Sequence, residues 1–524
     1  MYQLLLTAKY LTSKIMPLLA ACAVALCAAM VLIVWSVMGG FLDMLITSGR
    51  TIQSDLALYW PNAGIPYYQE LVDELEKDPA VDAAAPTIET FGLIILPNDL
   101  KRAVQVRGVD GKSYARVSSY KDILWWRPIT TPGRHDKQRE DLRLHDPILR
   151  VPAKVLLEQG LTLQRLDPKT HKPEPAAVLG IAVSGLNRRT DAGIWEPLAV
   201  TRAQSNGTID FADTFMPRDG YVTINVVPLD ARGNSVELST MRLPVANEFA
   251  SGVADADTSV VFVRLDALQR ALKLNEAPKI SPTDTPYKVV VDPTTGKETF
   301  VLDVAPAGTI PARATHILIK GQGSVRTEPE SRALKDACLA VYADFAERHK
   351  GEVPGLSQIQ AMTWREQNQT MIDAVQNEQV LLLVLFGIIS FVAVMLILAI
   401  FWSMVAERTK DIGTIRAIGA SRAGIAGIWV CYGCAIGLVG GAAGLGIAYA
   451  IVSNINPIHE WLGRQLGIVI WKPSVYVFDT IPHTVRPLDA LWVFALAVLA
   501  SAGGALIPAI RAALMDPVKA LRFE

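Results

Sequence analysis

The sequence is poor in the residues that usually carry catalysis, metal binding or disulfide bonding. It has 5 Cys and 7 His among 524 residues, and five cysteines in so long a chain do not make a disulfide framework. Neither charge is in excess, because 50 Lys and Arg face 51 Asp and Glu and leave a formal net charge of −1. A nucleic-acid-binding protein needs a basic surface, so this balance argues against one.

Charged residues are scarce as well, at 19% of the chain, whereas hydrophobic residues reach 51%. Soluble domains carry about 25% charged residues, so the composition argues against a soluble enzyme. It also excludes an intrinsically disordered chain, which would have few apolar residues. The length, as a soft prior, allows about three or four domain-sized units.

Motifs of common catalytic sites are present only as fragments. Residues 107–113 end like a Walker A motif, but Val106 stands where its first glycine is needed. A zinc-protease helix beginning at His459 would need a second His where Gly463 stands. The CxxC spacing at 431–434 lies in an apolar run, where small residues for helix packing explain it better than redox chemistry. We therefore predict no catalytic residue, no metal site and no cofactor bound by this chain.

What the sequence does contain is four long apolar runs, each above the roughly 20 residues that a membrane-spanning helix needs. In the first run most apolar residues follow Cys22, which favours an uncleaved membrane anchor over a signal peptide. We predict a membrane protein with four transmembrane helices. They cover residues 16–42, 380–406, 424–452 and 488–510.

Basic residues predict the orientation of these helices. Lys9 and Lys14 precede the first run, and four more lie between the second and third runs. Both termini are therefore expected in the cytoplasm. The remaining segments are then an N-terminal amphipathic segment at 1–15, an external domain at 45–377, a cytoplasmic helix at 407–423, an external loop at 453–487 and a cytoplasmic tail at 511–524.

The expected external domain mixes short alternating runs with helical patterns, which is typical of an α+β domain. Two stretches rich in proline or charge, at 127–175 and 277–311, are expected to be inserted loops. A hairpin turn is expected at Leu229, Asp230, Ala231, Arg232, Gly233 and Asn234. Helices are predicted at 68–77, 265–272 and 331–348, and strands at 92–96, 103–109, 178–183, 221–227, 259–263, 288–291 and 316–320.

The third apolar run carries glycines four residues apart. Gly433, Gly437 and Gly441 are in register, with Gly440 and Gly444 beside them. Glycine at this spacing removes side chains from one ridge of a helix and lets a second helix approach closely. We therefore predict a helix-packing ridge here, including Gly444.

The short cytoplasmic loop has Ile412, Ile415 and Ile418 at helical spacing between charged residues. This pattern predicts an amphipathic helix, either an interfacial anchor or a docking surface for a cytoplasmic partner. The loop resembles that of FtsX/MacB-type ABC transporter permeases, and the tail at 508–524 is similar to the end of that family. The loop residues that match are Glu407, Arg408, Asp411, Ile412, Ile415, Arg416, Ala417, Gly419, Ala420 and Ser421.

Within that family the chain resembles the lipoprotein-releasing permeases of the LolC/LolE type, on residues 31–41 and 473–482. The resemblance implies a bacterial inner-membrane permease without its own ATPase and with a MacB-like periplasmic domain. It implies a second permease subunit, identical or related, and a cytoplasmic ABC ATPase dimer that binds ATP and Mg²⁺. Residues Glu407, Arg408, Asp411, Ile412, Ile415, Arg416 and Gly419 would couple to that ATPase.

In such permeases, ATP-driven movement is relayed through the helices to the external domain, which is called mechanotransmission. Lol-type members pass lipoproteins to a periplasmic carrier through a hairpin hook, and Leu229 to Asn234 lie in a comparable place. Two alternatives remain within the family: an FtsX-like regulator of an external cell-wall hydrolase, and a MacB-like efflux component. A third is a membrane-anchored external enzyme, which would need a catalytic constellation that the sequence does not offer.

Overall fold

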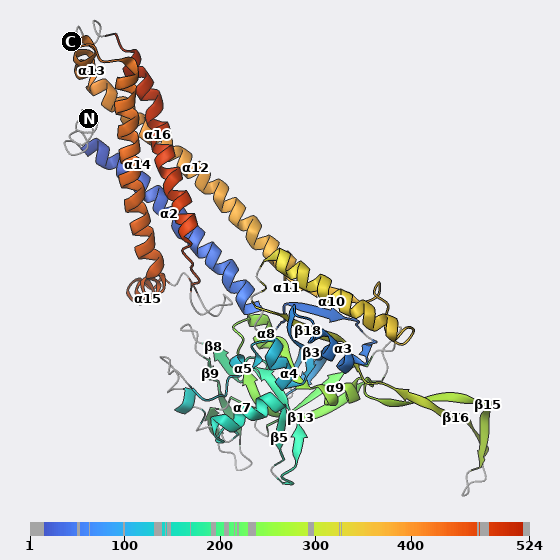
Figure 1. Ribbon diagram of the computed structural model, residues 1–524. Coiled ribbons are helices and arrows are strands. Elements are labelled where there is room, and N and C mark those ends of the chain that lie inside the picture. Colours follow the sequence, from blue (N-terminus) through green and yellow to red (C-terminus); the bar gives the residue numbers. More distant parts are fainter. Residues whose placement is uncertain are drawn as a thin grey trace. The chain divides into compact units, whose positions relative to one another are not determined.

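The computed structural model divides into two compact units (Figure 1). The helical unit comprises residues 1–45, 370–472 and 480–524, and the α+β unit comprises residues 46–369 and 473–479. The structure describes residues 15–49, 53–61, 63–97, 100–129, 139–141, 143, 148–167, 169–189, 195–203, 209–213, 215–216, 220–228, 237–291, 298–323, 325, 327–468, 471 and 481–516. The predicted segment at 1–15, apart from Ile15, the hairpin at 229–234 and the tail beyond 516 therefore lie outside the described residues.

Four helices of the helical unit are long and apolar enough to cross a membrane. Each predicted apolar run lies in one of them, but the helices extend beyond the runs. Residues 369–377 were expected in the external domain, but they form the first turns of α12. Polar residues limit how far a helix can be buried in lipid, but they do not prevent the helix from forming. The helices are α2 (Ile15–Gly49), α12 (Gln369–Glu407), α14 (Arg422–Ser453) and α16 (Pro487–Leu514).

Two shorter helices complete the described part of this unit. Helix α13 (Thr409–Ala417) lies within the predicted cytoplasmic segment at 407–423. Helix α15 (Ile455–Leu466) lies within 453–487, which was expected to be an external loop. These twelve residues are helical, and Pro457 falls in the first turn of α15, where proline does not break a helix.

The α+β unit is built on a nine-stranded mixed sheet with the order β12-β13-β7-β14-β4-β3-β18-β1-β19. The pairs β13–β7 and β14–β4 are parallel and the others are antiparallel. Its strands are β1 (Leu56–Tyr59), β3 (Val81–Ile95), β4 (Lys101–Val109), β7 (Ala177–Gly180), β12 (Tyr221–Val226), β13 (Ser239–Phe249), β14 (Val260–Arg264), β18 (His316–Gly321) and β19 (Gln360–Thr363).

Helices cover both faces of this sheet, and each face has its own core. One core includes side chains from α3 (Tyr68–Leu75), α9 (Leu265–Ala271) and α10 (Glu328–Arg348). The other includes side chains from α4 (Gly111–Val117), α5 (Tyr120–Ile123) and α8 (Ala254–Ser259). The remaining helices and strands are α7 (Ala153–Thr162), α11 (Trp364–Gln367), β2 (Ile65–Pro66), β5 (Gln164–Leu166), β6 (Pro173–Pro175), β8 (Asn187–Arg189), β9 (Trp195–Pro197), β10 (Ala199–Ala203), β11 (Ile209–Asp213) and β17 (Arg313–Ala314).

The segment at 277–311 was expected to be a loop, and this is wrong. It forms a long antiparallel hairpin, β15 (Ala277–Val291) with β16 (Glu298–Ile310) (Figure 1). Its pairing shifts register between Pro278 and Ile280 and between Pro282 and Tyr287. Proline is tolerated at such irregularities and on open strand edges. The other expected loop, 127–175, likewise contains α7, β5 and β6.

Candidate functional site

The predicted coupling residues form a helix–turn between α12 and α14. Arg408, with φ −101° and ψ 15°, separates α12 from α13. Gly419 has φ +105°, a conformation that favours glycine, and lets the chain turn after α13. Ser421 then caps α14, because its side-chain oxygen accepts a 3.0 Å hydrogen bond from the backbone N–H of Gly424.

The inner face of α13 is anchored in the helical unit. Ile412 is 5% exposed and belongs to the core cluster that includes Phe401 of α12 and Trp429 of α14. Ile415 is half-buried. Ile412 therefore fixes the helix to the bundle, although the sequence pattern had placed it among the residues that couple to a partner.

Arg416 joins α13 to the end of α16. Its Nη1 donates hydrogen bonds of 2.9 Å to the carbonyl oxygen of Ala513 and 2.6 Å to that of Met515. The last carbonyls of a helix have no partner within the helix, so a cation there satisfies them and interacts well with the helix dipole. Arg511 of α16 adds a second link, since its guanidinium lies 3.9 Å from the ring centre of Trp402 on α12.

The outer face of α13 is polar except for one large apolar side chain. Glu407, Asp411 and three further residues, Lys410, Thr414 and Ala417, are exposed, and Asp411 accepts a 2.9 Å hydrogen bond from Arg408. Ile418, directly after α13, is 83% exposed. At about 100° per residue it lies roughly 120° around the helix axis from Ile412, so the three isoleucines do not share one face.

The glycines of α14 contact two different helices rather than forming one ridge. A Cβ at Gly433 would lie 2.7 Å from the Cβ of Ala505, and one at Gly437 would lie 2.8 Å from the Cα of Val498. Gly441 faces Phe494, also on α16. Gly444 and Gly440 instead face α2, at Ala25 and Ala21 respectively. Gly444 thus packs closely against α2, whereas Gly433 packs against α16.

Ser501 of α16 strengthens the contact between α14 and α16. Its hydroxyl donates a 2.8 Å hydrogen bond to the carbonyl oxygen of Gly433, and its side chain is fully buried. The close approach of the two backbones makes this bond possible. Helix α14 thus approaches both α2 and α16 closely through its glycines.

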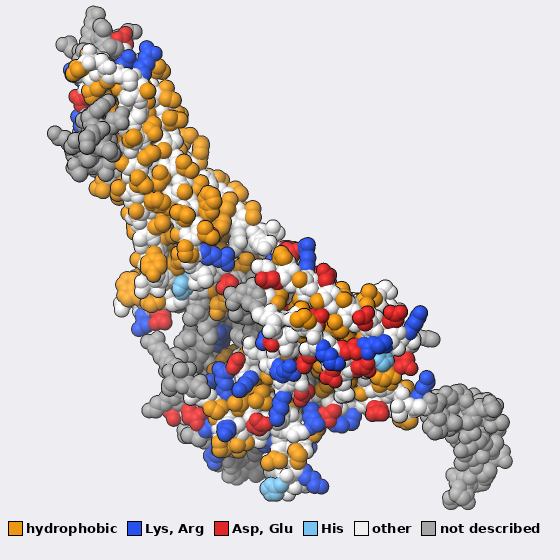
Figure 2. Space-filling model, viewed as in Figure 1, with side chains coloured by type: hydrophobic (Ala, Val, Ile, Leu, Met, Phe, Trp, Pro, Cys, Tyr) orange, Lys and Arg blue, Asp and Glu red, His pale blue; other side chains and the backbone are white. Residues whose placement is uncertain are grey.

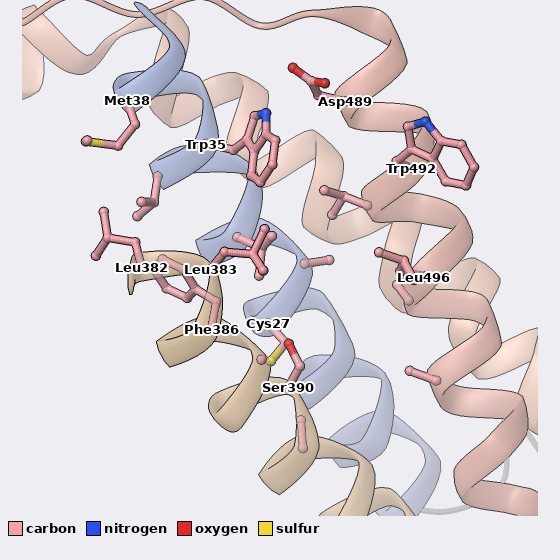
Figure 3. A pocket seen from close by; sticks show the side chains of 18 of the residues that line it. Cys27, Trp35, Met38, Leu382, Leu383, Phe386, Ser390, Asp489, Trp492 and Leu496 are labelled. Atoms are coloured by element: carbon pink, nitrogen blue, oxygen red, sulfur yellow. The ribbon is translucent and has the colours of Figure 1, made fainter. Parts of the chain in front are cut away.

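A groove of about 630 Å³ opens between α2, α12 and α16 (Figure 3). Its walls are apolar, with Leu383 and Phe386 from α12 and Trp492 and Leu496 from α16 (Figure 3). The polar side chains at the end where α16 begins are Gln379, Arg486 and Asp489, and Ser390 and Cys27 also line the groove. An apolar cavity with a polar mouth can hold an amphiphile that has long hydrocarbon chains.

A smaller, polar pocket of about 180 Å³ lies on the sheet of the α+β unit. Arg107 and Glu89 form its ion pair, with Nε 3.4 Å from Oε1, and Gln105 donates a 3.1 Å hydrogen bond to Glu89. Burial lowers the pKa of His316, which stacks on Tyr59. Arg107, Gln105 and Glu89 are thus linked to one another on this face of the sheet.

No group of three metal-binding side chains is found in the part of the chain that the structure describes. The predicted carrier hook at Leu229 to Asn234 lies outside those residues. Two features of the helical unit were not predicted from the sequence. They are the exposed Ile418, which an exact helical wheel would have separated from Ile412, and helix α15.

Residues 383–517 match the family model described as FtsX-like permease C-terminal. LolC, a lipoprotein-releasing system transmembrane protein of Neisseria meningitidis serogroup B, is 26% identical over 161 residues, which cover 31% of this chain and 39% of LolC. LolE of Haemophilus influenzae is 29% identical over 117 residues, covering 22% and 28%. The macrolide export ATP-binding/permease protein MacB of Hyphomonas neptunium is 32% identical over 120 residues, covering 23% and 15%.

The chain thus spans about two fifths of the length of the first curated relatives that it matches. Among solved structures, the periplasmic region of MacB from Actinobacillus actinomycetemcomitans is similar with a TM-score of 0.23 and 9% identity, over 62% of this chain and 94% of that one. The residues that match the family model, 383–517, include α13, α14 with its glycines and all of α16.

Proposed function

We propose that this chain, with its FtsX-like permease domain, is the permease subunit of a bacterial inner-membrane ABC transporter that extracts lipoproteins or related lipid-linked cargo. The ATP would be hydrolysed by a separate cytoplasmic ABC ATPase, and a second permease subunit would complete the transporter. The names of the curated relatives LolC and LolE support the cargo class. In this proposal both termini and α13 lie on the cytoplasmic side.

The arrangement of α13 is the observation that carries the proposal. Its outer face offers Lys410, Thr414 and the exposed Ile418 to a partner. Its inner face is fixed through Ile412 to the bundle and through Arg416 to the end of α16. A push on the outer face would therefore reach α12, α14 and α16 together, which is what mechanical coupling to an ATPase requires.

The groove supports lipid-linked cargo. The space-filling view shows apolar side chains over the long helices and charged side chains near their ends (Figure 2). The groove of about 630 Å³ enters this apolar zone from a mouth that carries Arg486 and Asp489. Acyl chains could occupy the apolar part while the polar head of a lipoprotein stays at the mouth. The α+β unit would then receive the cargo on the external side.

The first test is co-purification of the full chain, in detergent, from its native membrane. We expect an ABC ATPase together with lipoproteins or a soluble lipoprotein carrier. An ATPase with a cell-wall hydrolase would instead support the FtsX-like regulator, and an ATPase with an outer-membrane export channel would support the MacB-like efflux component. If no ATPase co-purifies, the proposal fails.

The second test separates the two faces of α13. Ile418→Asp should abolish co-purification of the ATPase while leaving the thermal unfolding of the chain unchanged, because this side chain is 83% exposed. Ile418→Leu is the matched control and should retain the ATPase. Arg416→Gln should keep the ATPase bound but uncouple ATP hydrolysis from cargo release, since it removes the link to Ala513 and Met515. Normal coupling in Arg416→Gln would exclude this path.

A further inference from the structure

Helix α15 has an apolar face that nothing in the described structure covers. None of its residues is buried. Trp461 is 58% and Leu466 59% exposed, and Ile458 is exposed as well. With about 100° per residue these three side chains and Leu462 fall on one side of the helix. The opposite side carries the ion pair between Glu460 and Arg464, with a distance of 2.6 Å.

Polar contacts hold α15 in this orientation. Asn456, about 160° around the helix from Ile458, accepts a 2.8 Å hydrogen bond from the N–H of Ile481 and donates one of 3.3 Å to its carbonyl oxygen. His459 accepts a 3.0 Å hydrogen bond from the N–H of Trp471. The helix is thus attached to its own unit through Asn456 on the polar side and through His459 at the border of the apolar face, whereas Trp461 and Leu466 stay exposed.

The segment to which α15 is attached leads to the mouth of the groove. After Ile481, the N–H of Thr484 donates a 3.0 Å hydrogen bond to the carbonyl oxygen of Ser36 on α2. The backbone of His483 lies so close to Gly40 that a Cβ there would be 2.6 Å from it. The chain then reaches Arg486 and Asp489 at the groove mouth. Movement of α15 would therefore move the mouth.

A lipid bilayer is the partner that fits the apolar face. Helix α15 begins two residues after the end of α14, whose exposed side chains include the apolar Val439, Ile447 and Tyr449. The apolar face of α15 continues that surface at the end of a helix long enough to span a membrane. A short helix with a strong apolar face, a tryptophan and an ion pair on the other side is typical of a helix lying in the membrane interface.

We infer that α15 lies in the interface of the external leaflet, with Ile458, Trp461, Leu462 and Leu466 in the boundary between headgroups and acyl chains. From there it anchors the segment that carries the groove mouth. This inference requires a membrane protein, but it does not depend on the ATPase or on the cargo. If the test below contradicts this inference, the proposed function is unaffected. If the proposed function is contradicted, this inference is unaffected.

The test measures the depth of α15 with a bimane label on Trp461→Cys in the full chain, reconstituted into phosphatidylcholine–phosphatidylglycerol vesicles. Arg464→Cys is the matched control on the opposite face, and the unsubstituted chain gives the background from the native cysteines. We expect brominated phosphatidylcholine to quench the label at 461 roughly twofold more than at 464. Aqueous iodide should show the reverse order.

Two results would overturn the inference. If iodide quenches both labels equally, the face is in water. If neither quencher reaches the label at 461, a protein covers the face, such as a second copy of the chain. The pair Ile458→Cys and Glu460→Cys repeats the comparison on the same two faces, so the result stands even where Trp461→Cys lowers the yield of folded protein.

Discussion

The two units of this chain differ in their closest helix contacts and in the charged residues that they bury. In the helical unit, Gly433 and Gly437 let α14 approach α16 closely, and no charged side chain is buried among its described residues. In the α+β unit, the fully buried side chains include Trp126 and Phe262, and charged residues such as Glu248 are buried too. The contact between α14 and α16 is therefore made by removing side chains. The cores of the α+β unit are filled with large side chains, as is the part of the helical unit around Phe401 and Trp429.

The solvent explains the difference. In water, burying large apolar side chains stabilises the folded state by about 25 cal/mol per Å² of apolar surface. In lipid that driving force is absent between helices, so close backbone contact and hydrogen bonds must hold them together. The contrast therefore supports the view that the helical unit, and not the α+β unit, is surrounded by lipid. Four predictions test it.

The largest effect is expected from Gly437→Leu. A Cβ at this position would already lie 2.8 Å from the Cα of Val498, so a leucine must push α16 away from α14. Overpacking of this kind costs about 3 kcal/mol or more. We expect little monodisperse protein after detergent extraction and a strongly lowered unfolding temperature. Gly446→Leu on the same helix is the control, because nothing lies within 4 Å of its Cβ position. Equal behaviour of the two variants would refute close packing.

The counterpart in the α+β unit is Asn247→Leu. The Asn247 side chain is fully buried and donates hydrogen bonds to the carbonyl oxygens of Trp126, at 2.9 Å, and Leu156, at 2.8 Å. A leucine would leave these groups buried without partners, at a cost of about 3 kcal/mol. Chemical unfolding of the full chain, followed by tryptophan fluorescence, measures this. Asn275→Leu, at an exposed position, should change little, and a similar loss there would contradict the argument.

A smaller effect is a pH dependence of the free energy of unfolding, which is expected from the α+β unit alone. Burial raises the pKa of Asp257 to about 6 from an ordinary value of 3.8. Because the folded state binds this proton more tightly than the unfolded state, protonation stabilises the fold, and the stabilisation is lost as the pH rises through about 6.

Between about pH 7 and about pH 5 the free energy of unfolding should gain about 1 kcal/mol from this group. Asp257→Asn should remove that part of the dependence, as measured by unfolding at several pH values. A pH dependence identical in the variant and the parent chain would show that another group is responsible.

The smallest effects on the free energy of unfolding are expected from removing one hydroxyl group in each unit. Ser501→Ala removes the 2.8 Å hydrogen bond to Gly433, and Tyr342→Phe removes a 2.7 Å hydrogen bond to the carbonyl oxygen of Pro354. We expect about 0.6 kcal/mol for the serine and about 1 kcal/mol for the tyrosine. Unfolding of the purified chain in mixed micelles compares the two. A loss of several kcal/mol for Ser501→Ala would mean that hydrogen bonds, rather than close packing, hold the helical unit together.

Much of the helical unit could be predicted from the sequence. The four apolar runs and the amphipathic α13 follow from composition, periodicity and residue type within short windows. In the α+β unit, α9, α10 and several strands follow from the same local signals. The hairpin of β15 and β16 was missed, because proline normally signals a loop and only the pairing with a second strand shows that it is tolerated.

Which residues meet was decided by the tertiary structure. The sequence alone determined that the glycines of α14 allow close packing, but only the placement of α2 and α16 divided them between two partners. It determined that α13 is amphipathic, yet only the fold showed that Ile412 faces inward and that Arg416 reaches the end of α16, 97 residues away from Ala513 along the chain. Local patterns set the conformation of a segment, whereas contacts depend on distant segments that no short window contains.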